Sequence, residues 1–420
     1  MIHFWDLPND RIHIKLKGGL SERMVEELLR RTGTIRDAGK MTGFSENTIK
    51  RMRKSDYKIK IKTVLQVSKL LAKNEFSPLT LEKSITWIGH PMNDGIENPR
   101  IPFNFSSRCG ARFVAAIFND GTISRHYGGI GRMMYDNFNE RLRESVKSDI
   151  IHVTGGKSGT LKDVITMHKK YVAFPSVYRD ILMKILEPGP KTETNQALPQ
   201  FILEKKSCML GWLEQTIADE GDVKYHPQKY RRSIVWRRSD DITDIAKGRV
   251  THDMPLRKMP KELRSIVGIC ECRMIIDELR LLEKLGISYD LYNLGVYMTV
   301  HGKVRTRWQI GITKRENLIR LRKMIKIPHR EKDMRFSLMM RGFVRYKEPL
   351  RPRKVVQILG REGRMITSGA LEKKMGYKNI GTANKWLHIL EREGIIRKVK
   401  ESSYDGGYRK PAHYVLTLGR

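Results

Sequence analysis

Two apolar segments, each closed by a carboxylate and a glycine, constrain the fold of this chain more than any other feature. One of them, LGWLEQTIADEGDV, occupies residues 210–223. Its apolar side chains recur at the spacing of one helix face, at Leu210, Leu213 and Ile217. We expect Gly221 to stop this helix in a left-handed turn. Asp219 and Glu220 would then lie at the negative end of the helix dipole, where a carboxylate is disfavoured unless a cation compensates it.

A second segment of the same kind, FVAAIFNDG, occupies residues 113–121. It is also apolar, and it ends in Asp120 followed by Gly121. Glu220 follows Asp120 by 100 residues, which is the length of one modest domain. A strand-like stretch comes after each glycine. The chain is therefore expected to contain two related halves, each beginning with a helix that ends in an acid.

The two segments resemble the paired motifs of the LAGLIDADG homing endonucleases, with Asp120 and Glu220 at the acidic position before the closing glycine. The resemblance covers roughly residues 105–346, because residues 281–287 and 307–327 match the strand and helix that end a repeat of this family. It implies an α+β fold in which two pseudo-symmetric αββαββα repeats form a saddle.

The same resemblance implies the chemistry. In the family, the motif helices pack side by side, so Asp120 and Glu220 are the expected catalytic residues and ligands of Mg²⁺, or of Mn²⁺ in its place. Carboxylates suit such hard cations. Asp219 is the rival ligand if the second helix ends one residue earlier. Lys314 is the expected basic residue near the end of the last strand of a repeat. Gln215 departs from the family pattern, in which a small residue is usual at that position.

The composition favours a polyanionic partner. Lys and Arg outnumber Asp and Glu by 81 to 46, which gives a formal charge of +35 and a pI near 10.1. Such an excess attracts nucleic acid, although association with ribosomes or a merely basic surface would give the same balance. No apolar run approaches the ~20 residues that cross a membrane, and the N-terminus lacks a secretory pattern. We therefore expect a cytoplasmic monomer that binds double-stranded DNA and no membrane.

The first 76 residues contain the pattern of a helix-turn-helix module. Gly43 suits the tight turn, and Ser45 can cap the second helix. The positions expected to face a major groove are Asn47, Lys50 and Arg51. Residues 77–105 are rich in proline and glycine, and they are expected to form a linker.

The last residues have the pattern of a winged helix, with three helical segments and two strand-like segments around the turn DGGYRK. Its expected DNA contacts are Thr382, Asn384, Lys385, Arg409 and Lys410. A basic strand interleaved with aromatic residues, 223–239, adds the expected contacts Lys224, Arg231 and Arg237. The predicted division is a helix-turn-helix domain (1–76), a linker (77–105), two repeats (106–190 and 200–346) joined by a linker (191–199), and a winged helix (347–420).

Three functions fit these features. A site-specific, metal-dependent homing endonuclease is favoured, because a pure binding protein has no use for paired buried carboxylates. A transcription regulator on the same scaffold, without nuclease activity, is the alternative. The two flanking modules favour the regulator, because they exceed what an endonuclease needs. An RNA maturase is disfavoured, since helix-turn-helix modules read duplex DNA.

Overall fold

The computed structural model describes residues 1–54, 56–91, 95–124, 133–155, 165–189, 195–226, 231–246, 248–250, 252–269, 271–341, 356–360, 365–376, 380–400, 403–405, 408–410 and 412–417. These residues form a mixed α+β protein with small antiparallel sheets, which confirms the coarse fold class expected from the sequence. One hydrophobic core includes residues from Ile2 through to Met339, and the C-terminal residues have a core of their own.

The N-terminal unit combines helices with a four-stranded antiparallel sheet in the order β2-β1-β3-β4. Its elements are α1 (Leu20–Thr32), α2 (Ile35–Thr42), α3 (Glu46–Met52), α4 (Ile61–Leu71), α5 (Pro78–Lys83), β1 (His13–Leu16), β2 (Ile59–Lys60), β3 (Ile85–Gly89) and β4 (Gly95–Glu97). Thr34 caps α2 by accepting from the amide of Asp37, and Ser45 caps α3 by accepting from the amide of Thr48. Gly43 lies between the two helices with a left-handed φ of 71°. These caps and the turn fix where α2 ends and α3 begins.

The segment expected to be a linker, residues 77–105, contributes α5 and two strands of this sheet, β3 and β4, so that expectation was wrong. β3 pairs with both β1 and β4. Pro78 occupies the first turn of α5, where its missing N–H costs no hydrogen bond. Gly89 and Gly95 face each other across two strands, and a Cβ on either would collide with the ring of Trp87. Three of the residues that suggested a linker, Pro78, Gly89 and Gly95, therefore fit packed structure.

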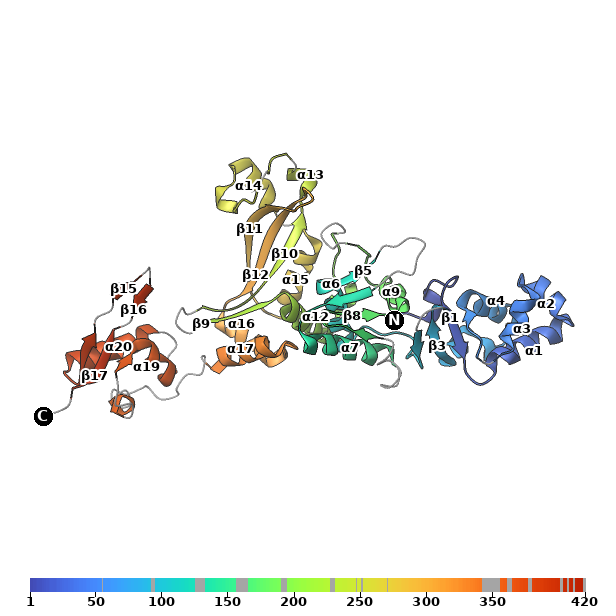
Figure 1. The fold of residues 1–420 in the computed structure, drawn as a ribbon, viewed down its shortest axis with the longest axis horizontal. Helices are drawn as coiled ribbons and strands as arrows, with labels where there is room; N and C mark the ends of the chain where they lie inside the picture. The colour runs from blue at the N-terminus through green and yellow to red at the C-terminus, as the bar shows by residue number, and fades with distance from the viewer. Residues whose placement is uncertain are drawn as a thin grey trace.

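The central part consists of two units. The first contains α6 (Arg108–Asp120), β5 (Gly121–Ile123), β6 (Met133–Asp136), α7 (Glu140–Thr154), β7 (Thr166–Met167), β8 (Tyr171–Phe174) and α9 (Ser176–Leu182). The second contains α12 (Lys206–Asp219), β9 (Asp222–His226), β10 (Arg231–Asp241), α15 (Arg273–Lys284), β11 (Asp290–Met298), β12 (Val304–Ile312) and α16 (Arg315–Met324). In the second unit, α13 (Thr243–Ala246) and α14 (Lys261–Val267) are inserted after β10 and lie at the far end of the long strands (Figure 1).

The described elements of both units follow one order, α-β-β-α-β-β-α, once the insertion is set aside. Their sheets also have the same strand order, β5-β6-β8-β7 in the first and β9-β10-β12-β11 in the second. This order agrees with the repeat that the resemblance implies, while membership of the LAGLIDADG family stays a prediction. The predicted linker at 191–199 has no helix or strand in its described part, 195–199.

The first helices of the two units, α6 and α12, pack side by side at the centre (Figure 1). Every residue of α12 from 208 to 218 is buried. The helices approach each other closely at Gly211, where an added Cβ would lie 2.3 Å from the carbonyl oxygen of Arg108 and 3.2 Å from the Cβ of Ala111. The small residue that close packing needs is therefore Gly211, and Gln215, four residues later, is fully buried and hydrogen-bonded.

The N-terminal unit is joined to the first central unit by buried polar contacts. Asp180 of α9 is 2% exposed, and it accepts from Arg11 at 3.1 Å and lies 2.8 Å from the Nε2 atom of His90. The amide of Arg100 donates to the carbonyl of Thr154 at 2.6 Å. Together with the shared core, these contacts make the two units one packed body.

The C-terminal residues form a small separate unit. Its elements are α19 (Ser368–Met375), α20 (Ile380–Arg392), a sheet of β13 (Ile366–Thr367), β17 (His413–Leu416) and β14 (Ile396–Lys400) in that order, and a hairpin of β15 (Ser403–Asp405) and β16 (Tyr408–Lys410). Thr367 caps α19 by accepting from the amide of Ala370. Leu371, Leu387 and Leu390 are fully buried in its core. A further helix, α17 (Arg330–Arg341), precedes this unit and belongs to the main core.

Candidate functional site

The two acid-ended helices, α6 and α12, end in equivalent ways. The amide of Gly121 donates to the carbonyl of Ile117, and the amide of Gly221 donates to the carbonyl of Ile217. An added Cβ at either glycine would lie 2.5 Å from that isoleucine oxygen. Neither glycine has a left-handed φ, so the expected left-handed stop at Gly221 was wrong. Glycine is required because the chain leaves each helix against its preceding turn, and the residue before each glycine is one of the two predicted site acids.

The end of α12 separates its two neighbouring acids. The helix ends at Asp219, and Glu220 is the capping residue. Asp219 accepts hydrogen bonds from three neutral donors: the hydroxyl of Tyr135 at 2.7 Å, Nε2 of Gln215 at 2.9 Å and Nδ2 of Asn119 at 3.3 Å. Burial, and then the nearby charge of Asp120, raise the pKa of Asp219 from 3.8 to about 7. Asp219 therefore lies in the contact between the helix ends, where ionisation is disfavoured.

Asp120, at the end of α6, is oriented by the loop that follows β6. Its Oδ2 atom accepts from Nδ2 of Asn137 at 3.3 Å. Asn137 is itself fixed, because Arg143 donates to its carbonyl oxygen at 2.6 Å and the amide of Asn139 donates to its Oδ1 atom at 2.9 Å. Asp120 retains partial exposure. The loop thus holds this carboxylate with a neutral amide at the boundary between core and solvent.

Glu220 has a cationic partner. Nη1 of Arg238 lies 3.3 Å from its Oε1 atom. Arg238 is 4% exposed, donates to both carboxylate oxygens of Glu278, and donates to Oδ1 of Asn119 at 3.0 Å. This guanidinium joins Glu220 to the core and to the end of α6. Sequence reasoning missed Arg238, and the available signal was strand alternation, since Arg238 follows the buried Trp236 by two residues.

A lysine from outside the two units lies at the end of α12. Lys332, on α17, donates to the carbonyl oxygen of Ala218 at 2.6 Å and to those of Ile217 and Asp219 at 3.3 Å each. Burial lowers the pKa of Lys332, and nearby carboxylates, foremost Asp219 and then Asp120, oppose that shift. The ammonium group of Lys332 thus provides part of the positive charge that compensates the acid at the end of α12. The sequence held no signal for this contact, because only the fold brings α17 to α12.

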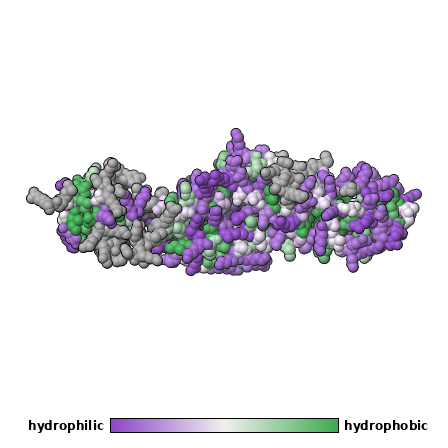
Figure 2. Space-filling view, turned by 90° about the horizontal axis from the view of Figure 1, so that it is seen from below, coloured by the Kyte–Doolittle hydropathy of each residue, from purple (hydrophilic) through white to green (hydrophobic). Residues whose placement is uncertain are grey.

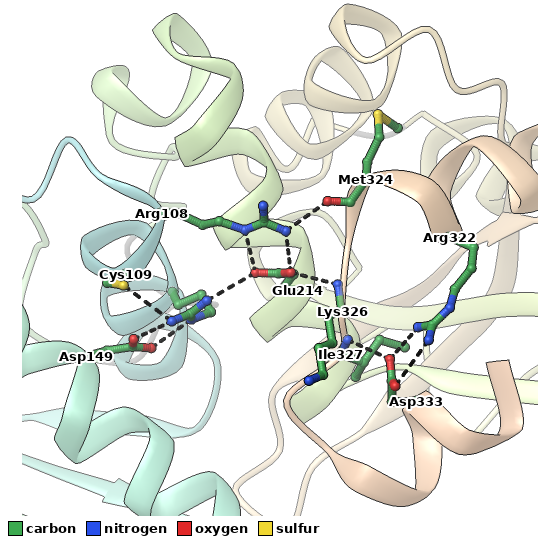
Figure 3. Close-up of polar contacts among 10 residues, drawn as sticks. Arg108, Cys109, Asp149, Glu214, Arg322, Met324, Lys326, Ile327 and Asp333 are labelled. Atoms are coloured by element: carbon green, nitrogen blue, oxygen red, sulfur yellow. Dashed lines mark hydrogen bonds and ion pairs between the residues drawn. The ribbon is translucent and has the colours of Figure 1, made fainter. Parts of the chain in front are cut away.

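A buried network holds the segment that leads into α17 (Figure 3). Glu214 of α12 is 1% exposed, and it accepts from Arg108 at 2.5 and 3.0 Å and from the main-chain amide of Lys326 at 2.8 Å. Further along, Asp333 of α17 accepts from the amide of Ile327 at 3.0 Å. Both ends of the connection between α16 and α17 are therefore tied, and this fixes the place of α17 beside α12.

Within the described residues, no group of three or more His, Cys, Asp or Glu side chains is placed to hold a metal ion. Asp120 and Glu220 instead stand at the ends of paired helices. Mg²⁺ in phosphoryl-transfer sites is usually held by one or two carboxylates, with substrate phosphates and water as the other ligands. The donor set fits that mode of binding. Lys314, the predicted basic residue, is exposed at the start of α16, and no hydrogen bond or ion pair among the described residues joins it to these acids.

The second sheet presents basic and aromatic side chains on one face. On β10, Trp236 is buried and Arg237 is exposed, so Arg237 marks the face directed away from the core. The strand register places Gln309 beside Arg237 on one side and beside Tyr292, which is 49% exposed, on the other. One row along, the guanidinium of Arg307 lies over a tyrosine ring, that of Tyr297, at 4.6 Å. We call these five residues the open sheet face.

The remaining predicted DNA contacts are dispersed over the chain. Those exposed are Asn47, Lys50 and Arg51 on α3 and Lys385 on α20. Those partly exposed are Lys224, Thr382 and Asn384. The side chains of Arg231, Arg409 and Lys410 lie outside the described residues. On the face drawn in Figure 2, hydrophilic residues cover most of the described surface, and the hydrophobic patches are small and separate.

Comparisons with known proteins add no family assignment: no protein-family model matches the chain, and no curated protein sequence matches it. In the part of the chain that the structure describes, no helix combines the length and apolar character needed to cross a bilayer.

Proposed function

We propose that this protein binds double-stranded DNA and hydrolyses its phosphodiester bonds with the help of a divalent cation, as a LAGLIDADG-type endonuclease. The observation that carries the proposal is the meeting of two equivalent helix ends from two units of equal strand order. The ends are in contact, since Asn119 donates to Asp219 across them. A pair of related acids, Asp120 and Glu220, suits a substrate whose two strands are themselves related by twofold symmetry.

The chain's own residues would hold and orient the reacting groups. Asp120 and Glu220 would bind Mg²⁺ or Mn²⁺ together with phosphate oxygens of the DNA. A cation bound there supplies an activated water and neutralises charge on the leaving oxygen. Asn137 orients Asp120, and Arg238 orients Glu220. The raised pKa of Asp219 limits the negative charge that faces the phosphates.

Binding would use the open sheet face. Arg237 and Arg307 offer planar donors to phosphate or to the guanine edge, and Gln309 offers both a donor and an acceptor. The exposed Tyr292 adds an aromatic surface in the same row. The formal charge of +35 supports a polyanionic partner for this surface.

The second candidate function is a DNA-binding regulator without nuclease activity, and one observation favours it. Lys332 already compensates the end of α12, and Arg238 already pairs with Glu220. The survival of both acids therefore does not by itself require a metal ion. This candidate retains the open sheet face and the flanking units as DNA contacts.

Cleavage of a plasmid library in Mg²⁺ or Mn²⁺ separates the two candidates. We expect the wild type to cut a subset of sequences, and Asp120→Asn and Glu220→Gln each to reduce the rate by at least ~100-fold, because each removes one cation ligand. Binding in Ca²⁺ should persist in both variants. Glu316→Gln, at an exposed position of α16, removes the same charge away from the site and should cut normally.

One outcome would count against the endonuclease, and another would count against Glu220 as a ligand. Tight and selective DNA binding without cleavage of any sequence in either metal supports the regulator. Cleavage that survives Glu220→Gln but is lost in Asp120→Asn and in Asp219→Asn means that the second ligand is Asp219.

A further inference from the structure

We propose that Lys332 is a positioning residue for the acid pair, Asp120 and Glu220. Helix α17 then contributes a residue to the site in addition to connecting the site to the C-terminal unit. Lysine has three N–H donors. The contacts with the carbonyl oxygens of Ile217, Ala218 and Asp219 match that number. The ammonium group is therefore engaged by the main chain of α12, and it acts on Glu220 through that main chain.

These contacts fall on the turn from which Glu220 projects. The amide of Glu220 donates to the carbonyl of Thr216 at 2.9 Å, and the amide of Gly221 donates to that of Ile217 at 3.1 Å. Carbonyl oxygens at the end of a helix lack the partners that the rest of the helix provides. Lys332 supplies a charged donor there and so holds the last turn closed. Without it, Arg238 would still hold the side chain of Glu220, and Thr216 would still accept from its amide, but the last carbonyl oxygens of α12 would lose their charged donor.

The position of Lys332 also sets the charge of the site. Burial lowers the pKa of Lys332, and the charges of four nearby carboxylates, Asp219, Asp120, Asp222 and Glu220, act to raise it. Removing the charge of Lys332 would make the site more attractive to a divalent or trivalent cation and, at the same time, would loosen the helix end that positions Glu220. Cation affinity and cleavage rate should therefore change in opposite directions, whereas damage to the fold would reduce both.

The position of the helix end is tested directly by hydrogen exchange of the full-length chain. In Lys332→Met, peptides covering residues 216–222 should exchange at least ~10-fold faster, because the last turn of α12 opens. Lys332→Arg retains the charge and the donors, and it should restore most of the protection. Lys323→Met, at an exposed position of α16, is the matched control and should behave as the wild type. If the methionine variant does not fold, Lys332→Gln, which keeps a neutral donor, should give intermediate exchange.

Protection of residues 216–222 that is unchanged in Lys332→Met or Lys332→Gln would overturn the inference. Hydrogen exchange needs neither DNA nor metal, so it tests the positioning role of Lys332 independently of the proposed function. Only the expected effect of Lys332 on cleavage rests on the proposed function. A wild type that cuts no DNA, combined with local opening in the variant, would refute the endonuclease and leave the positioning role supported.

Titration with Tb³⁺ in the absence of DNA, followed by a cleavage assay, tests the charge argument. Lys332→Met should bind Tb³⁺ on the order of tenfold more tightly and cut DNA at least ~10-fold more slowly. Weaker Tb³⁺ binding in this variant would reduce Lys332 to a structural role. Lys314→Met is the rival variant: slower cleavage in it, with normal cleavage in Lys332→Met, would assign the basic residue to Lys314 and refute the inference.

Discussion

Asp219 and Glu220 are neighbours in the sequence, but they meet different surroundings because the helix ends between them. The side chain of Asp219 points into the contact with α6 and is held by neutral donors, among them Tyr135. Glu220 lies just past the helix and reaches Arg238. The end of the helix thus separates a carboxylate that lies among neutral donors from one that lies at the surface beside a guanidinium.

The raised pKa of Asp219 predicts that stability depends on pH. Its pKa is about 7 in the folded protein against 3.8 for the ordinary side chain. The folded state therefore binds the proton more tightly, and stability falls as pH rises from about 4 to about 7. We expect Asp219→Asn to raise the free energy of unfolding at pH 8 by on the order of 2–4 kcal/mol and to change it little at pH 4. Urea unfolding of both proteins at the two pH values measures this, and equal pH slopes would contradict it.

At the scale of elements, the packing of α6 against α12 depends on their close approach at Gly211. An alanine at Gly211 would place its Cβ 2.3 Å from the carbonyl oxygen of Arg108, so the helices would have to separate. We expect Gly211→Ala to lower the free energy of unfolding by at least ~1–3 kcal/mol and to raise hydrogen exchange at both helix ends. Gly369→Ala in α19 meets its nearest neighbour at 4.0 Å and should be neutral or slightly stabilising. Thermal unfolding of the two variants compares them, and equal melting temperatures would show that the helix pair adapts.

The same elements show what the sequence could reveal. The end of α6 at Asp120 was predictable because the apolar period, the acid and the glycine all lie within one short segment. The same pattern placed the end of α12 one residue too late, at Glu220, whereas the helix ends at Asp219. Residues 77–105 were misread because proline occurs both in the first turn of a helix, as Pro78 does, and in linkers, and the sequence alone does not distinguish the two. Lys332 could not be assigned to the site, since basic residues are common in this chain and only long-range packing brings α17 to α12. Strand alternation along β10 indicated that Arg238 is buried, but only the fold shows that it reaches Glu220.

At the scale of the whole molecule, the excess of Lys and Arg is spread along the chain, and this predicts that DNA binding depends strongly on salt concentration. With a formal charge of +35, we expect contacts with roughly six to ten phosphates, so that the logarithm of affinity falls linearly with the logarithm of salt concentration with a slope near that number. Fluorescence anisotropy with labelled duplex DNA between low and moderate salt measures the slope. A slope near zero would remove nucleic acid as the partner in every version of the function.

The shared core between the N-terminal unit and the first central unit, reinforced by Asp180 with Arg11 and His90, fixes α3 at one separation from the paired helices. On duplex DNA a separation along the axis is also an angle around it, because the helix turns once in roughly 10 base pairs. A DNA target contacted by both α3 and the paired helices would then need its two contacted segments at a fixed angle around the duplex axis. Five extra base pairs between the two contacted segments would turn one of them to the opposite side of the duplex. Ten extra base pairs would return it to the same side, but at a distance greater than the packed contact between the two units of the protein allows.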